Sequence, residues 1–193
     1  MTTIGMIRHG VTEWNQLGKS QGLTDIPLNE EGNKQARSLA DHLGIEGGWD
    51  FIVSSDLLRA VQTAEHLSDK LHIPILFYDH RIREIDCGQI EGTTEGERLQ
   101  RWGVNWREQD LGMEKAADVA KRGMDFLKEL DDTYPDKRIL MVSHGALIGV
   151  TLQYLLPNQF PKTFIENTSL TILEKKEGNW CCSRYNATNH LGG

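Results

Sequence analysis

The stretch Thr3-Ile4-Gly5-Met6-Ile7-Arg8-His9-Gly10 opens the chain and decides the expected fold. Residues 3–7 form a short, mainly apolar run, which predicts a buried strand. The strand ends where the polar residues Arg8 and His9 begin. In a sheet of parallel strands that helices cover on both faces, ligands bind just beyond the carboxyl ends of the strands. The sequence therefore places Arg8 and His9 at the edge where a ligand site is expected.

The remainder of the chain repeats the order strand, then helix. This order predicts an α/β fold: a three-layer α/β/α sandwich, with a mostly parallel sheet, helices on both faces and a C-terminal hairpin or edge strand. Asn29 is a suitable N-cap for the first long helix, and Gly44 is placed to end it. The further strands are expected at 51–54, 75–77, 138–143, 170–174 and 180–185, and the helices at 30–43, 57–71, 114–133 and from about 146.

Length and charge narrow the functional classes. The chain has 193 residues and ordinary proportions of hydrophobic (38%) and charged (25%) residues, so we expect one globular domain over residues 1–193. The formal net charge of -7 argues against a nucleic-acid partner. Any anion site must therefore be built locally, by a few converging cations.

The three cysteines favour reduced thiols. Cys181 and Cys182 are adjacent in a segment that alternates like a strand, so their side chains point to opposite faces. No stretch approaches the roughly 18 apolar residues of a membrane helix, and residues 1–10 lack the pattern of a signal peptide. We expect a cytoplasmic protein with no membrane partner. No His-x-x-x-His or Cys-x-x-Cys spacing occurs, so no metal and no cofactor is expected.

Residues that suit an anion gather at the predicted edge of the sheet. His9 and His144 each follow an apolar strand, and Arg59 lies just inside the helix after the strand 51–54. Arginine and helix N-termini both bind phosphate oxygens well. Further donors in the first loop are Asn15, Gln21 and Gly22. The pattern favours a phosphate site.

Five segments in order resemble the motifs of the histidine phosphatase superfamily, also called the phosphoglycerate mutase-like family. One such segment would be a weak signal, and five across nearly the whole chain are a strong one. The segments are IRHGVTEWN at 7–15, Gln21-Gly22 with DIPLN at 25–29 and Gly32, SSDLLRAVQTA at 54–64, REIDCGQIEG at 83–92, and VSHG at 142–145.

The resemblance implies a role for each matching residue. His9 would be the nucleophile, and Glu84 the general acid that then activates water. Arg8, Arg59 and a protonated His144 would form the charged pocket around the phosphoryl group. Asn15, Gln21, Gly22 and Gly145 would bind the phosphate or lie near it. The substrates implied are small-molecule phosphate esters.

Other acids and other activities stay open at this point. Asp86 and Glu91 are the nearest rivals of Glu84. The alternatives to a phosphatase are a 2,3-bisphosphoglycerate-dependent mutase and a non-catalytic phospholigand-binding protein. The segment 92–112 is shorter than we expect for a mutase, which favours hydrolysis. We expect a monomer or a homodimer, and specificity set by 92–112 and the first loop.

Two features of the sequence have no assigned role. Lys19 stands where the family pattern leads us to expect arginine, which puts a contact to a second anionic group in doubt. Trp102 and Trp106 are four residues apart, and they either pack in the core or wall the substrate pocket.

Overall fold

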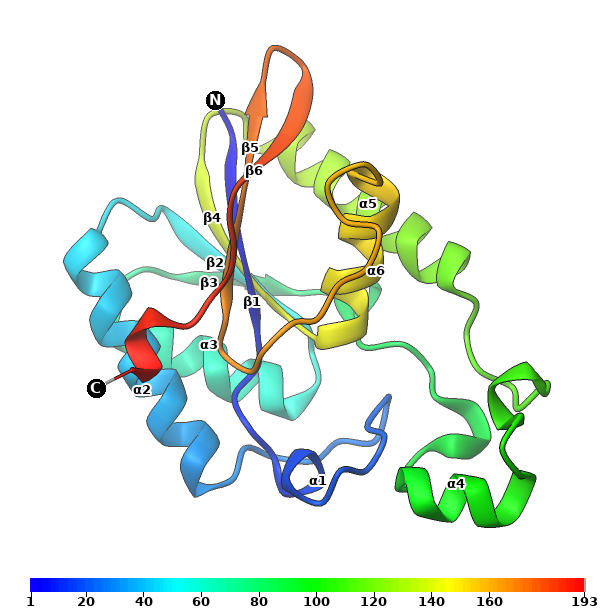
Figure 1. The fold of residues 1–193 in the computed structure, drawn as a ribbon. Coiled ribbons are helices and arrows are strands. Elements are labelled where there is room, and N and C mark those ends of the chain that lie inside the picture. The colour runs from blue at the N-terminus through cyan, green and yellow to red at the C-terminus, as the bar shows by residue number, and fades with distance from the viewer. Residues whose placement is uncertain (193) are drawn as a thin grey trace.

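The computed structural model describes residues 1–192, which build a six-stranded sheet with helices on both faces (Figure 1). The strands are β1 (Thr3–Arg8), β2 (Phe51–Ser54), β3 (Ile75–Tyr78), β4 (Arg138–Ser143), β5 (Leu170–Lys176) and β6 (Asn179–Ala187). Their order across the sheet is β3-β2-β4-β1-β5-β6. The first four strands run parallel, and β5 pairs antiparallel with both β1 and β6. The predicted fold class, including the C-terminal hairpin, is confirmed.

Two pairs of helices form the outer layers. Helices α2 (Glu30–Glu46) and α3 (Leu58–Leu71) cover one face of the sheet, and α5 (Ala116–Thr133) and α6 (Gly145–Leu155) cover the other. Shorter elements are α1 (Glu13–Gln16), α4 (Glu95–Trp102) and the 3-10 turns His80–Ile82, Gly88–Ile90, Trp106–Glu108 and Asn189–Leu191.

The alternation of side chains along the strands produces two apolar cores. In β4, Leu140 and Val142 pack with α2 and α3, whereas Ile139 and Met141 pack with α5 and α6. All four are at most 1% exposed. Burying one such side chain stabilises a fold by about 1.5–3 kcal/mol, so both faces hold the central strands in place.

The structure corrects one expected helix end and one irregular segment. Asn29 caps α2 as predicted, accepting a hydrogen bond from the Gly32 amide, but α2 continues through Gly44. It ends at Gly47, whose φ of 63° is the left-handed conformation that favours glycine. Residues 92–110 show no clean period in sequence, and the structure places helix α4 within them.

Within residues 1–192, no helix is long and apolar enough to cross a membrane. All three cysteines are free thiols, as expected, and Cys87 is buried.

Candidate active site

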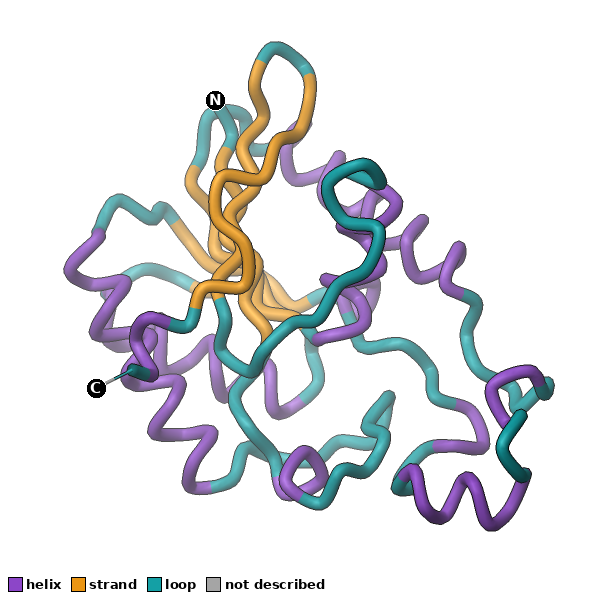
Figure 2. Tube along the Cα trace, viewed as in Figure 1, coloured by secondary structure: helices purple, strands orange, loops and turns teal. Residues whose placement is uncertain are grey.

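The order of the parallel strands brings the predicted residues together. In register, Arg8 of β1 lies opposite Ser143 of β4, and Ser54 of β2 lies opposite Val142. The carboxyl ends of these three neighbouring strands therefore meet at one edge, where loops leave the sheet (Figure 2). The ring centroids of His9 and His144, which follow β1 and β4, are 5.2 Å apart.

His9 presents the lone pair of one defined ring nitrogen. Its Nδ1 lies 2.7 Å from the carbonyl oxygen of Gly10, which can only accept, so Nδ1 carries the proton. Nε2 is then free to accept, and it receives a hydrogen bond from Nε of Arg59 at 3.3 Å. Burial lowers the pKa of His9 well below 6.5, and the nearby Arg59 and Arg8 lower it further. The ring is therefore neutral and nucleophilic at neutral pH.

Arg59 is a fully buried cation beside this nitrogen. It is the second residue of α3, and its guanidinium donates to the carbonyls of Gly22 (2.7 Å) and Thr24 (3.1 Å). Burial lowers the pKa of Arg59 to about 10, with Glu84 the acid that opposes this most. The side chain remains charged at neutral pH and is held by the first loop.

The surroundings of His144 favour a neutral ring before substrate binds, whereas the sequence predicts a protonated ring around the phosphate. Burial lowers its pKa well below 6.5, and Arg59, His9 and Arg8 lower it further. Its Nε2 lies 2.8 Å from Oγ of Ser55, whose oxygen also receives the Leu57 amide at 3.3 Å. When the hydroxyl of Ser55 donates to Nε2, the ring proton of neutral His144 lies on Nδ1, which is then a donor. The ring contributes a hydrogen bond in place of a charge.

Three buried donors of predicted site residues have no partner within residues 1–192. They are Nε of Arg8, Nε2 of Gln21 and Nδ1 of His144. Buried polar groups are almost always paired, so three unpaired donors indicate a ligand rich in acceptor atoms. Arg8 is also tied through Nη1 to the carbonyl of Ile165 at 2.6 Å, and burial lowers its pKa. A phosphate has the oxygens that such a site requires.

Gly145 packs against this arginine. A Cβ on Gly145 would come within 3.2 Å of Nε of Arg8, so a side chain there would press on the guanidinium. Gly10 is as constrained, because a Cβ on it would lie 2.6 Å from the carbonyl oxygen of Gly32 in α2. These glycines allow close approach of the loop that holds His9.

Glu84 is a nearly buried acid whose carboxylate is bound at the N-terminus of α6. Its carboxylate accepts hydrogen bonds from the amides of Ala146 and Leu147 at 3.1 Å, and it is 8% exposed. Of the surrounding acids, Glu84 raises the pKa of both Arg8 and Arg59 the most, against the lowering effect of burial.

The rival acids have other partners. Glu91 accepts the amides of Gly22 at 3.0 Å and Thr24 at 3.1 Å, and Asp86 caps the amide of Gly88 at 2.8 Å. The amide of Gly22 is therefore not free to bind a substrate phosphate, contrary to the expectation from the sequence. Glu91 instead shapes the first loop, which in turn holds Arg59.

Asn15 and Gln21 are each partly engaged within the first loop. Asn15 Oδ1 accepts the Thr12 amide (3.1 Å) in a capping box, and also Nδ2 of Asn167 (3.3 Å). Only the amide nitrogen of Asn15 could donate to a substrate. Gln21 Oε1 accepts the hydroxyl of Thr12 at 2.7 Å, which leaves its unpaired Nε2 as the donor.

Three residues that the sequence analysis did not single out hold the site. Ser55 orients His144, Thr63 accepts the amide of Gly10 at 3.1 Å, and Asn167 donates to the carbonyl of His9 at 2.9 Å. Ser55 and Thr63 lie inside the motif at 54–64 and could have been found from it. Asn167 is 158 residues from His9 in sequence, and no local pattern indicates it.

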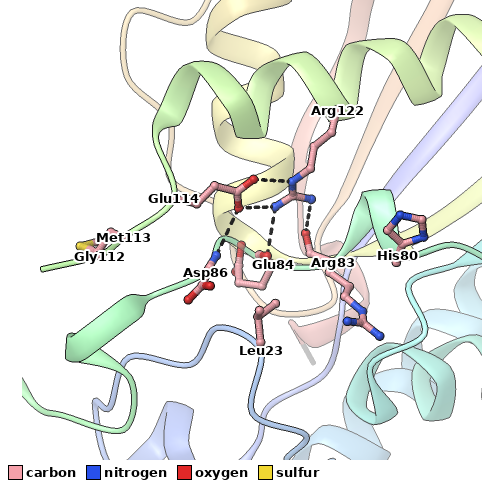
Figure 3. Close-up of a pocket in the computed structure, with 9 residues that line it drawn as sticks. All are labelled: Leu23, His80, Arg83, Glu84, Asp86, Gly112, Met113, Glu114 and Arg122. Atoms are coloured by element: carbon pink, nitrogen blue, oxygen red, sulfur yellow. Dashed lines mark hydrogen bonds and ion pairs between the residues drawn. The ribbon is translucent and has the colours of Figure 1, made fainter.

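Two cavities share Glu84 as a wall. One of about 440 Å³ includes residues of the segments 80–86 and 112–114, with Leu23 and Arg122 (Figure 3). The other, of about 360 Å³, is lined by Arg8, Gly145 and Phe164 among others. Of the segment 92–112, only Gly112 is among the residues lining these cavities.

The tryptophans and Lys19 lie apart from these cavities. Trp106 is 6% exposed and packs with Cys87, Ile90 and Leu111, with Trp102 against the same cluster. The packing interpretation of both rings is therefore favoured. Lys19 places its ammonium 5.8 Å from the centre of the Trp14 ring. Within residues 1–192, no group of three His, Cys, Asp or Glu side chains could hold a metal ion.

Comparison with known proteins gives matches over nearly the whole chain. The family model of the histidine phosphatase superfamily (branch 1) matches residues 4–188. The "Uncharacterized phosphatase PhoE" of Bacillus subtilis (strain 168) is 37% identical over 195 residues, which cover 100% of this chain and 98% of that protein. Phosphoserine phosphatase 1 of Hydrogenobacter thermophilus is 31% identical over 100% of this chain and 95% of its own. The solved structure of Bacillus stearothermophilus YhfR has a TM-score of 0.88 at 28% identity, covering 99% of this chain and 100% of that one.

Proposed function

The chain belongs to the histidine phosphatase superfamily, and from this premise we propose that it hydrolyses small phosphomonoesters through a phosphohistidine at His9. The observation that carries the proposal is the state of His9: a buried, neutral ring whose Nε2 lone pair lies beside the Arg59 guanidinium. Such a nitrogen can attack phosphorus, and the adjacent cation can stabilise the transferring group.

The first step transfers the phosphoryl group to the protein. Nε2 of His9 forms a bond to phosphorus while the bond from phosphorus to the ester oxygen breaks. In the substrate complex Glu84 carries a proton and gives it to that oxygen, so an alcohol leaves and Glu84 becomes the carboxylate that accepts the amides of α6. Proton donation matters because an alkoxide is a poor leaving group.

The second step returns the protein to its starting state. A water molecule loses a proton to the Glu84 carboxylate and attacks phosphorus. The bond from phosphorus to Nε2 breaks, inorganic phosphate leaves, and His9 is neutral again. The same carboxyl group thus serves as acid and then as base.

The charge of the phosphoryl group is matched by fewer cations than the sequence suggested. Arg8 and Arg59 together supply about +2, against a phosphate ester of about -1.5 to -2. Neutral His144 then donates Nδ1–H to a phosphoryl oxygen, together with Nε of Arg8 and Nε2 of Gln21. A dianion in this place would also favour proton uptake by His144, so binding of substrate and proton would be coupled.

The packing of the segment 92–112 supports net hydrolysis over a mutase. The segment 92–112 folds into its own cluster around Trp106 and leaves only Gly112 beside the cavities at Glu84. The volumes of about 440 and 360 Å³ suit leaving groups of metabolite size.

A pair of assays on one preparation tests the proposal. We expect hydrolysis of a panel of metabolite phosphates and of 4-nitrophenyl phosphate, with loss of this activity in His9→Ala. Isomerisation of 3-phosphoglycerate in the presence of 2,3-bisphosphoglycerate, at a rate above hydrolysis, would establish the mutase instead. Tight binding of phosphate esters with no turnover would establish the non-catalytic alternative.

A further inference from the structure

Arg122 of α5 uses its whole guanidinium to hold the segment that bears Glu84. Nη1 donates to the carbonyls of Arg81 (2.6 Å) and Arg83 (2.7 Å), and Nη2 donates to the carbonyl of Glu84 (3.0 Å). The two remaining donors, on Nε and Nη2, bind the Glu114 carboxylate at 2.8 and 3.0 Å. All five N–H groups of the side chain are thus used.

Glu114 extends the same clamp beyond Glu84. Its Oε2 accepts the amide of Asp86 at 3.2 Å, and its own amide donates to the carbonyl of Asp86 at 2.9 Å. Figure 3 shows Arg122 and Glu114 on the same side of the cavity, joined to the backbone of residues 83–86. The pair therefore fixes the chain on both sides of Glu84.

The segment needs such external support because it has no regular structure of its own. Residues 83–87 belong to neither a helix nor a strand. The backbone of Glu84 is tied to α5 through Arg122, and its carboxylate is tied to the amides of Ala146 and Leu147 at the start of α6. Because α5 and α6 pack against each other, the backbone and the side chain of Glu84 are both anchored to the same helical layer.

We propose that Arg122, together with Glu114, is a positioning residue that sets the place of the Glu84 carboxyl group for proton transfer. This inference rests on the proposed function, in which Glu84 protonates the leaving group. A displacement of about 1 Å can cost on the order of 10²-fold in rate when a reacting group must be aligned. The loss should be largest for leaving groups that need a proton most.

Two other roles for Arg122 give different results. Arg122 lines the cavity of about 440 Å³, so it could bind an anionic substrate group directly; its removal would then raise KM. A purely structural role would lower the rates for all substrates together, in proportion to the folded protein lost. The saturated guanidinium argues against the first role, because substrate binding would require the loss of bonds already formed.

The experiment compares Arg122→Gln, Arg122→Lys and Glu114→Gln with Glu84→Gln. Lys121→Gln is the matched control, since Lys121 precedes Arg122 on α5 and its ion pair is with Asp125 at the surface. For each variant, kcat and KM are measured on an alkyl phosphate and on 4-nitrophenyl phosphate, whose leaving group needs little protonation. Thermal unfolding is recorded for each, and activity is scaled to folded protein.

We expect Arg122→Gln to lower kcat for the alkyl phosphate by on the order of 10²-fold and for the aryl phosphate by less than about tenfold, with little change in KM. Arg122→Lys and Glu114→Gln should show the same selectivity at smaller size, and Lys121→Gln should match the unchanged protein. The double variant Glu84→Gln/Arg122→Gln should be no slower on the alkyl phosphate than Glu84→Gln.

The outcomes that overturn the inference are distinct from those that overturn the proposed function. Suppose that Glu84→Gln lowers kcat more for the alkyl than for the aryl phosphate. The inference is then overturned if the Arg122 and Glu114 variants lose kcat equally on both substrates, or if they raise KM. If Glu84→Gln is not selective, the assignment of Glu84 fails, and the inference fails with it. Should Arg122→Gln not fold, Arg122→Lys and Glu114→Gln decide the matter by the same comparison.

Discussion

Replacing Arg59 with methionine should separate activity from stability. The Arg59 side chain is fully buried, and burial lowers its pKa from an ordinary 12.5 to about 10. That difference corresponds to a cost of about 3 kcal/mol for keeping the charge in the fold. Against this, Arg59→Met leaves the carbonyls of Gly22 and Thr24 without their donor, at about 1–3 kcal/mol each. We expect the free energy of unfolding to fall by no more than about 3 kcal/mol.

Activity should respond far more strongly than stability. Loss of one well-placed charge donor typically lowers kcat by about 10²–10³-fold. Removing the cation also removes one cause of the low pKa of His9, so the acid limb of the kcat/KM profile should move up toward pH 6.5. The measurements are kcat/KM from about pH 4.5 to 8 and urea unfolding at pH 7. Arg37→Met, on the exposed surface of α2, is the matched control.

Two results would refute this reasoning. Arg59→Met could keep its rate within about tenfold of the unchanged protein, which would remove Arg59 from the phosphoryl site. Alternatively, the rate could fall only in step with the folded fraction, with an unmoved pH profile. Arg59 would then be a structural residue of the first loop.

Three further predictions concern the surroundings of the site. Burial lowers the pKa of His9 and His144, so below pH 6.5 the unfolded chain takes up protons that the folded protein does not. The melting temperature should therefore be highest above pH 6.5 and fall toward pH 5. A melting temperature that does not change with pH would contradict this. Burial raises the pKa of the Cys87 thiol to about 12. Mass spectrometry after treatment with a maleimide at pH 7 should therefore find Cys87 unlabelled in the folded protein. Rapid labelling would show that solvent reaches the thiol. Gly10→Ala places a Cβ 2.6 Å from the Gly32 carbonyl oxygen and should destabilise the protein by about 1–3 kcal/mol in urea unfolding, with a cost near zero being the contrary result.

Local sequence patterns predict most of the fold. The apolar run of β4 and the motif after it located His144 at the sheet edge, because strand burial and register follow from alternation and parallel order. Helix α4 could also have been predicted, since Thr94 and Glu97 form a capping box whose residues are visible in the sequence. The end of α2 could not be read from Gly44 alone, because a single glycine is tolerated within a helix.

The parts of the site that were missed depend on contacts between distant segments. Arg122 reaches carbonyls 38 to 41 residues away, and backbone acceptors leave no trace in side-chain patterns. Asn167 reaches His9 across 158 residues. The charge of His144 follows from burial among cations, which only the folded structure defines. The sequence predicts a substrate contact for the amide of Gly22, because its actual partner, Glu91, lies 69 residues further along the chain.

The proposed mechanism requires a covalent bond between phosphorus and His9, and rapid quenching can detect that bond. The protein is mixed with a 4-nitrophenyl phosphate carrying labelled phosphorus, stopped in alkali within the first turnover, and digested for mass spectrometry. We predict one phosphate per chain on the peptide that bears His9, stable in alkali, lost in acid, and absent from His9→Ala. Rapid turnover with no such phosphate on His9, or an acid-stable phosphate on another residue, would contradict the account.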